Sequence, residues 1–234
     1  MTKNKWKTFL CASWLMLCTF SGFCGEYFQD GITWQYSENG TVTGYSPKDV
    51  TELVIPAQMN GKTVTSIGYR AFYGCSGLTS VTIPDTVTYI GVAAFYGCSG
   101  LTSVTIPDSV TSIGFLAFLG CSGVTSVHIT DLKKWCGSII SSVGLTNPHD
   151  LYINGNKVLD LTIPDSVTSI ASEAFSGCRG LTSVTIPNSV TNIGNQAFYN
   201  CANLTNLTIG ASVVRIGDSA FYRCERLVGA LTIP

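Results

Sequence analysis

The chain has 234 residues, of which 45% are hydrophobic and 12% charged, and its formal net charge at pH 7 is −1. This length and hydrophobic content are enough for a full core and exclude a largely disordered chain. Because nucleic-acid binding needs a strongly basic face, the near-neutral charge predicts no nucleic-acid partner.

The first 25 residues differ from the rest. A head with Lys3, Lys5 and Lys7 precedes the apolar run FLCASWLMLCTF, and the small-residue stretch SGFCG follows. This order predicts a secretory signal peptide over residues 1–25, cleaved near Cys24 or Gly25. The alternatives are an uncleaved membrane anchor and a lipoprotein attached at Cys24. The apolar run is shorter than the roughly 20 residues of a membrane span, which argues against the anchor. After removal we expect no transmembrane segment and a secreted or cell-surface protein.

Residues 26–49 are predicted to form an N-terminal cap. The stretch ITWQYSENGTVTGY contains two alternating segments around Asn39-Gly40, a dipeptide typical of hairpin turns. A β-hairpin here would cover the first apolar face of a stacked structure.

Residues 50–234 repeat one unit. Residues 78–98 read LTSVTIPDTVTYIGVAAFYGC and residues 101–121 read LTSVTIPDSVTSIGFLAFLGC. The Ala-Phe pair recurs at steps of 23 residues, a period within the range of leucine-rich repeats. Within a unit, Val104 and Ile106 have strand spacing, and Pro107 ends the strand. We therefore predict a mostly β solenoid whose 23-residue coils stack on a parallel β-sheet ladder, with strands near 50–55, 78–83, 101–106, 124–129, 158–163, 181–186, 204–209 and 228–233.

One coil is enlarged, over residues 130–157. Ile129 and the equivalent Ile163 are 34 residues apart, which is 23 plus 11. Thr130 or Asp131 is a candidate cap for a short helix with Leu132, Trp135 and Cys136 on one face. The run 151–153 predicts an extra strand, joined to the next through Asn154-Gly155-Asn156. Irregular insertions in repeat arrays often form functional surfaces.

The repeated motif L-T-S-V-T-I-P-x-S-V-T-x-I-G-x-x-A-F-x-x-C resembles the BspA-like leucine-rich-repeat proteins. The resemblance covers residues 50–234, the cap at 27–49 is similar to the family's first segment, and VHITDLKKWCGS…LYINGNKV resembles a variant coil of such arrays. It implies a secreted or surface protein of host-associated bacteria or protists, with a role in adhesion to host proteins and other microbes. No catalytic residue comes with this family. Members often carry an anchoring region, and we expect none within this sequence.

Six cysteines recur with the coil, three residues after each repeat phenylalanine: Cys75, Cys98, Cys121, Cys178, Cys201 and Cys224. Equivalent side chains of stacked coils point the same way, which favours buried free thiols over disulfides. Zinc sites use close pairs such as C-x-x-C, so we expect no metal and no cofactor. Disulfides and a metal remain the alternatives for this ladder, and Cys136 is the thiol to test for reactivity.

Catalysis finds little support in the sequence. A constellation of Cys136, His149 and Asp150 is conceivable, but nothing in its spacing favours it. The glycines recur with the coil and belong to turns, so they do not form a phosphate-binding loop. No pair of carboxylates has a spacing that indicates general acid–base catalysis. We therefore predict that the chain is not an enzyme.

The outward face of the ladder is the candidate binding surface. It carries short hydroxyl side chains that also suit a strand for structural reasons, and His128 interrupts them. As a binding surface it would be a polar platform for extracellular proteins or glycans, such as those of a host matrix. The alternative function is a structural or antigenic surface spacer without a defined site. The candidate ligand-binding residues are Thr82, Thr105, His128, Trp135, Tyr152, Asp160 and Thr185.

Overall fold

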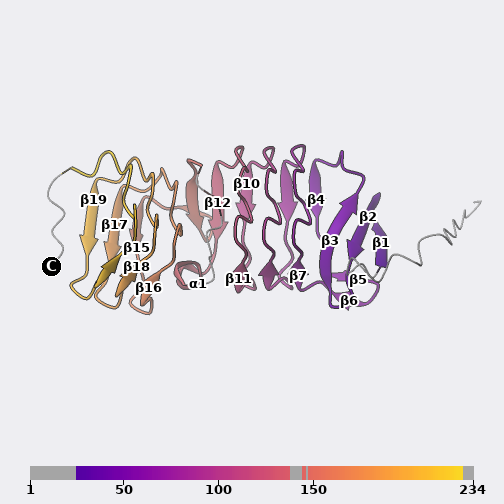
Figure 1. The fold of residues 1–234 in the computed structure, drawn as a ribbon, viewed down its shortest axis with the longest axis horizontal. Helices are drawn as coiled ribbons and strands as arrows, with labels where there is room; N and C mark the ends of the chain where they lie inside the picture. Colours follow the sequence, from indigo (N-terminus) through magenta and orange to yellow (C-terminus); the bar gives the residue numbers. More distant parts are fainter. Residues whose placement is uncertain (1–24, 138–143, 146, 229–234) are drawn as a thin grey trace, which may run out of the picture.

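The computed structural model describes residues 25–137, 144–145 and 147–228. The chain winds into an elongated, mostly β solenoid of about seven stacked turns of roughly 23 residues, with the cap at one end (Figure 1). The predicted fold class is therefore confirmed. The predicted signal peptide lies outside the described residues, apart from Gly25.

The cap is an antiparallel meander of β1 (Gly25–Gln29), β2 (Ile32–Tyr36) and β3 (Thr41–Ser46). The predicted hairpin at Asn39-Gly40 is present, with Gly40 at a φ of 77°. Trp34 and Tyr45 are buried, and the Tyr45 ring centroid lies 5.6 Å from that of Phe72 in the first coil. The meander thereby covers the apolar end of the solenoid, as capping segments of repeat arrays do.

The main ladder contains one short strand per turn, and neighbouring strands pair in parallel within each sheet. Every strand places a valine or leucine inward between two outward side chains, which is the period-2 pattern of the sequence. Seven of the eight predicted positions hold a strand, and the eighth, near 228–233, lies outside the described residues except for Val228. These seven strands, together with the extra strand β13 (Asp150–Ile153) of the enlarged coil, make up the ladder: β4 (Glu52–Val54), β8 (Ser80–Thr82), β10 (Ser103–Thr105), β12 (Ser126–Ile129), β15 (Asp160–Thr162), β17 (Ser183–Ile186) and β19 (Asn206–Ile209).

A second set of two-residue strands lies on another side of the coils and was not predicted from the sequence. In the first half it joins the cap, because β3 pairs in parallel with the first of these strands. A further small hairpin is formed by β5 (Gln58–Met59) and β6 (Lys62–Thr63). The two-residue strands are β7 (Ser66–Ile67), β9 (Tyr89–Ile90), β11 (Ser112–Ile113), β16 (Ser169–Ile170), β18 (Asn192–Ile193) and β20 (Arg215–Ile216).

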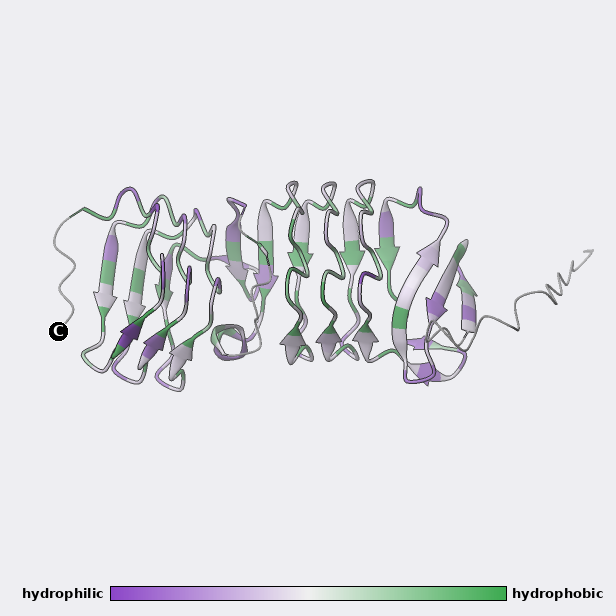
Figure 2. Ribbon diagram, viewed as in Figure 1, coloured by the Kyte–Doolittle hydropathy of each residue, from purple (hydrophilic) through white to green (hydrophobic). Residues whose placement is uncertain are grey.

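Identical residues stack on one another inside the solenoid. The rings of Phe72 and Phe95 are 4.9 Å apart and nearly parallel, and those of Phe198 and Phe221 are 5.4 Å apart. Figure 2 shows hydrophobic residues recurring at the same place in successive strands. Close stacking also requires glycine: a Cβ added to Gly114 would lie 2.5 Å from the backbone nitrogen of Val92. The repeat therefore encodes one continuous core with a fixed distance between coils.

The enlarged coil contains the predicted helix and hairpin. The helix α1 (Leu132–Cys136) is capped by Asp131, whose carboxylate accepts a bond from the Lys134 amide at 2.9 Å. Strand β13 continues the ladder next to β12, and β14 (Asn156–Lys157) folds back antiparallel to it. The turn residues Asn154 and Gly155 have φ of 51° and 78°, as a type I′ turn requires. The insertion therefore adds one strand and its return to the ladder.

Candidate functional site

The repeat cysteines are buried free thiols. In four of the coils the cysteine Sγ donates to the backbone oxygen of the phenylalanine one coil earlier. The Cys98 thiol reaches Phe72 at 3.0 Å and the Cys201 thiol reaches Phe175 at 3.2 Å. Cys121 and Cys224 make the same bond. The ladder thus satisfies carbonyl groups inside the core, which is a structural role.

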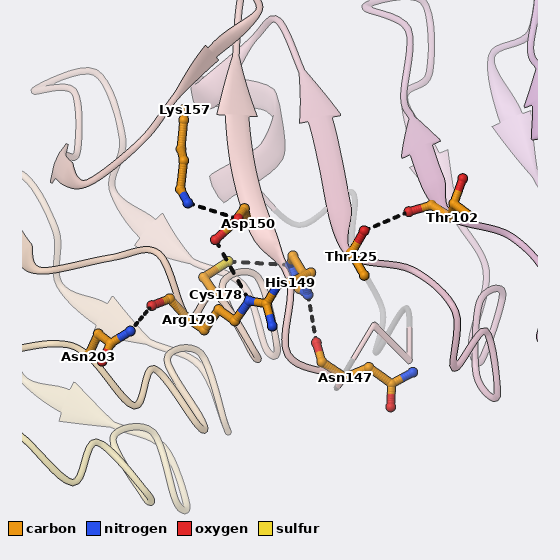
Figure 3. A network of polar contacts seen from close by, with 9 residues as sticks. All are labelled: Thr102, Thr125, Asn147, His149, Asp150, Lys157, Cys178, Arg179 and Asn203. Carbon is orange, nitrogen blue, oxygen red and sulfur yellow. Dashed lines mark hydrogen bonds and ion pairs between the residues drawn. The ribbon is translucent and has the colours of Figure 1, made fainter.

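At the enlarged coil, the ring of His149 takes the place of the phenylalanine carbonyl that accepts from the cysteine thiol in other coils. The coil before Cys178 has no repeat phenylalanine, and the Cys178 Sγ instead lies 3.4 Å from Nε2 of His149 (Figure 3). The other ring nitrogen, Nδ1, lies 2.8 Å from the backbone oxygen of Asn147. Since only a protonated Nδ1 can donate to a carbonyl, Nε2 is left as the acceptor for the thiol.

The pair of Cys178 and His149 is electrically neutral. Burial lowers the pKa of His149, and burial raises the pKa of the Cys178 thiol. Both effects oppose a thiolate–imidazolium pair, which is the form that an activated cysteine nucleophile takes. We interpret this contact as packing at a coil junction.

The constellation of Cys136, His149 and Asp150 is not assembled. The ring of His149 is held by Asn147 and Cys178, and the Asp150 carboxylate lies 2.9 Å from the Lys157 amine. Cys136 is buried, and burial raises the pKa of its thiol to about 12. Its backbone oxygen accepts from the Ala171 amide, in the way that Ile90 accepts from Gly114 in a regular coil.

Trp135 is a core residue, which corrects its expected place on a binding surface. Its side chain is buried, and its Nε1 donates to the backbone oxygen of Ala174 at 2.7 Å. In regular coils the equivalent oxygen accepts a backbone amide, such as that of Phe175 donating to Ala197 at 2.8 Å. The indole therefore replaces a main-chain donor that the irregular coil lacks.

The outward column of the main ladder holds most of the predicted site residues. Thr105 is in register with His128, and His128 with Tyr152. The two rings stack, with centroids 4.5 Å apart and planes 17° apart. The column also includes Thr82 and Thr185, both exposed. The structure thus brings together hydroxyl side chains and one half-buried aromatic pair on a single face.

A neighbouring column of threonines has a structural role. The hydroxyls of Thr79, Thr102 and Thr182 donate to backbone oxygens one coil earlier, at 2.9, 3.4 and 3.2 Å. Thr125 does the same to Thr102 (Figure 3). These side chains reinforce the stacking of coils, so the first threonine of each L-T-S-V-T unit is a weaker candidate for binding than the second.

Charged residues gather beside the aromatic pair. Asp150 lies 2.9 Å from Lys157 and 3.9 Å from Arg179, as Figure 3 shows. Sequence reasoning missed this cluster because its members come from three separate segments. Asp160 is exposed in the ladder next to Ser183 and accepts a bond from the Thr182 hydroxyl at 3.1 Å. The site is therefore polar, with its charges partly paired.

Two features are absent from the described part of the chain. It contains no helix long and apolar enough to cross a membrane. It also contains no group of three or more histidine, cysteine, aspartate or glutamate side chains arranged to hold a metal ion.

Comparison with known proteins identifies the family. The family model of the BspA type leucine rich repeat region matches residues 45–149 and 146–231, with six copies. The chain belongs to this family. No curated protein matches this leucine-rich-repeat chain. Proteins with this repeat and fold are typically non-catalytic.

Two solved structures share the fold of this leucine-rich-repeat protein. A leucine rich cell surface protein from Faecalibacterium prausnitzii A2-165 is 34% identical with a TM-score of 0.57, covering 88% of this chain and 54% of that one. The T. pallidum leucine rich repeat protein is 29% identical with a TM-score of 0.56, covering 80% of this chain and 82% of that one. The chain thus spans about half the length of the first relative.

Proposed function

We propose that this chain is a non-catalytic protein-binding module, secreted or held at the cell surface, and that its partner docks on the outward face of the main ladder. The observation that carries the proposal is the stacked pair of His128 and Tyr152 within a row of exposed threonines. Aromatic side chains are enriched among residues that dominate binding energy. Hydroxyls that make no bond within the fold remain available to a partner.

Two observations support a location outside the cell or at its surface. The first 25 residues have the composition of a signal peptide. A similar chain from Faecalibacterium prausnitzii A2-165 is described as a cell surface protein. Candidate partners are extracellular proteins, including those of a host matrix, and glycans.

Affinity for a single site is expected to be modest. The face has one aromatic pair and few charges, whereas tight interfaces use several tryptophan, tyrosine or arginine anchors. Repeated display of the protein would raise the overall affinity by multivalency.

The test is binding of the full chain to immobilised collagen, laminin, fibronectin and heparin, measured by surface plasmon resonance. A double variant, Thr105→Lys with Thr185→Lys, places two charges on the face. A matched control, Ser76→Lys with Ser122→Lys, adds the same charge at exposed turns. Circular dichroism establishes that all three proteins fold.

We expect saturable binding of the wild type and the control to at least one probe, and its loss in the face variant. Equal binding by all three proteins would move the site away from the ladder face. Absence of binding to every probe, also by a multivalent display, would support the alternative of a surface spacer.

A further inference from the structure

The turn that follows each two-residue strand differs between the two halves of the solenoid. In three successive coils of the first half it exposes a large apolar or aromatic side chain: Tyr69 is 64% exposed, Val92 37% and Phe115 51%. The equivalent residues of the second half are the polar Ser172, Asn195 and Asp218. Because the same position of the fold accepts both kinds of side chain, the stability of the coil does not explain the apolar ones.

Main-chain hydrogen bonds show that these residues stack from coil to coil. The Arg70 amide donates to the Val92 oxygen at 3.2 Å, and the Ala93 amide donates to the Phe115 oxygen at 3.0 Å. The second half repeats the pattern, from Glu173 to Asn195 and from Gln196 to Asp218. At a strand spacing of about 4.8 Å, the three exposed side chains extend over roughly 10 Å along the solenoid. We call Tyr69, Val92 and Phe115 the turn column.

A second aromatic position in the same turn belongs to the fold. Tyr73 stacks on Tyr96 with ring centroids 5.0 Å apart, and Tyr199 stacks on Tyr222 at 5.7 Å in the second half. Because this stacked pair occurs in both halves, it does not explain their difference. The feature particular to the first half is the turn column.

The turn column is a continuous apolar surface. Apolar side chains scattered singly over a protein need no explanation, but neighbouring ones that form a patch mark a site of interaction. The turn that contains Phe115 adds the half-buried Leu116 and Leu119 to this surface. The turn column is therefore a candidate docking surface for a partner.

Arg70 is the one charged residue in the turn segments 66–76, 89–99 and 112–122. Its guanidinium carbon lies 5.0 Å from the ring centroid of Tyr69 and 4.8 Å from that of Tyr73. Within the part of the chain that the structure describes, no carboxylate forms an ion pair with it. Aromatic rings attract a cation without neutralising it. Arg70 therefore offers a positive charge at one end of the turn column.

This charge and the composition of the turns determine the chemistry of the partner. A second copy docking through the same column would bring another Arg70 and no carboxylate, because the three turn segments contain no acidic residue. A glycan would need aromatic faces for stacking, whereas the middle of the column is Val92. A peptide with apolar side chains and one carboxylate satisfies both the column and the cation.

We propose that the turn column is a second docking surface, which takes a short apolar peptide segment of another protein whose aspartate or glutamate reaches Arg70. The apolar side chains would cover Tyr69, Val92 and Phe115, and the carboxylate would pair with the planar guanidinium. The length of roughly 10 Å corresponds to about three extended residues. The inference goes beyond the proposed function, because the turn column lies outside the strands of the main ladder.

The probe is a phage-displayed library of random dodecapeptides, selected on the immobilised full chain. Enriched peptides are synthesised, and their dissociation constants are measured by fluorescence polarisation for the wild type and for each variant. Circular dichroism establishes that the variants fold.

The column variant replaces the turn column by polar residues: Tyr69→Ser, Val92→Asn and Phe115→Ser. The second half carries Ser172 and Asn195 at equivalent positions, so the fold is compatible with these side chains. The substitutions remove the apolar surface and leave Arg70 in place.

We expect the enriched peptides to combine apolar residues with an aspartate or glutamate, and their affinity to fall about tenfold or more in the column variant. The matched control is Leu159→Ser with Val214→Asn, which removes two exposed apolar side chains outside the turn column and should bind as the wild type does. Failure to enrich any peptide, or equal affinity for the wild type and the column variant, would overturn the proposal.

Arg70→Gln tests the carboxylate separately. Gln196 occupies the equivalent position with a φ of 55°, against 54° for Arg70, so the backbone accepts glutamine. The variant should weaken binding about threefold or more and remove the salt dependence of the affinity. Arg223→Gln removes a guanidinium over the Tyr222 ring and should change neither. Wild-type affinity and salt dependence in Arg70→Gln would overturn the proposal, and this single exposed substitution remains decisive if the column variant folds poorly.

The alternative occupant, a second copy, is tested by sedimentation equilibrium. A wild-type dimer that dissociates in the column variant would overturn the proposed partner. The outcome is also separable from that of the proposed function. If no peptide binds the column while a matrix protein still binds the ladder face, only the turn-column inference is wrong. If a peptide binds the column and no matrix protein or glycan binds the chain, the ladder face is not a binding surface and the turn column is.

Discussion

The Cys178 thiol lies 3.4 Å from Nε2 of His149, at the place where other coils offer a phenylalanine carbonyl. Irregular coils of a solenoid must satisfy the hydrogen-bonding groups of their regular neighbours. Here a histidine side chain supplies the missing acceptor and the Trp135 indole supplies a missing donor. The enlarged coil can therefore change its backbone while the Cys178 thiol and the Ala174 carbonyl of its neighbour stay paired.

Replacing His149 by alanine should destabilise the protein by about 2–4 kcal/mol, because it opens a cavity and removes the acceptor of a buried thiol. The measurement is the free energy of unfolding in denaturant. His128→Ala is the matched control, because His128 is half-buried on the surface of the ladder. Equal effects of the two substitutions would contradict the junction role of His149.

Because His149 is buried, the free energy of unfolding should fall as the pH is lowered. Burial lowers its pKa in the folded state below the ordinary value of 6.5, so the unfolded chain binds the proton more readily below that pH. The stabilisation is thus complete above pH 6.5 and is lost as pH falls toward the lowered pKa, by up to about 1.4 kcal/mol per pH unit. His149→Gln should show a shallower decline between pH 7 and pH 5. Parallel pH profiles of the two proteins would show that His149 does not titrate this way.

Replacing Trp135 by phenylalanine keeps an aromatic ring and removes the Nε1 donor. The carbonyl of Ala174 then remains unpaired in the core, which should cost about 1–3 kcal/mol of unfolding free energy. Chemical denaturation measures it. A variant as stable as the wild type would mean that the 2.7 Å bond to Ala174 contributes nothing.

The spacing between coils should not tolerate a side chain at Gly114. An added Cβ would meet the Val92 nitrogen at 2.5 Å, whereas one added to Gly77 would meet nothing within 4 Å. Gly114→Ala should therefore lower stability by about 1–3 kcal/mol or more, and Gly77→Ala by about 0.5 kcal/mol or less. The comparison requires thermal or chemical unfolding of both variants. Similar stabilities would argue against the tight stacking of these coils.

Most of the fold could be predicted because the same pattern of strand and turn residues recurs in successive coils of the sequence. The spacing of Val104 and Ile106 predicts the ladder strands, and Asn154-Gly155 predicts the hairpin of the enlarged coil. The two-residue strands such as β9 were missed because two residues show no periodicity.

The site was harder to predict. His128, Tyr152 and Thr105 fall in one column because the repeat register could be extended through the insertion. The roles of Trp135 and His149 depend on which groups of the next coil lack partners, and that is a property of three-dimensional packing. One signal was present in the sequence: the enlarged coil lacks the Ala-Phe pair, so its donors and acceptors had to be replaced.

The central claim is that a partner binds the outward face at the stacked pair of His128 and Tyr152. The most direct measurement is the dissociation constant of the matrix protein that binds the full chain, compared between wild type and His128→Ala with Tyr152→Ala. The matched control is Tyr73→Ala with Tyr222→Ala, which removes two exposed aromatic rings outside the main-ladder strands. The account predicts affinity weakened about tenfold or more by the first pair and unchanged by the second. An unchanged affinity in the first variant, or an equal loss in the control, would contradict it.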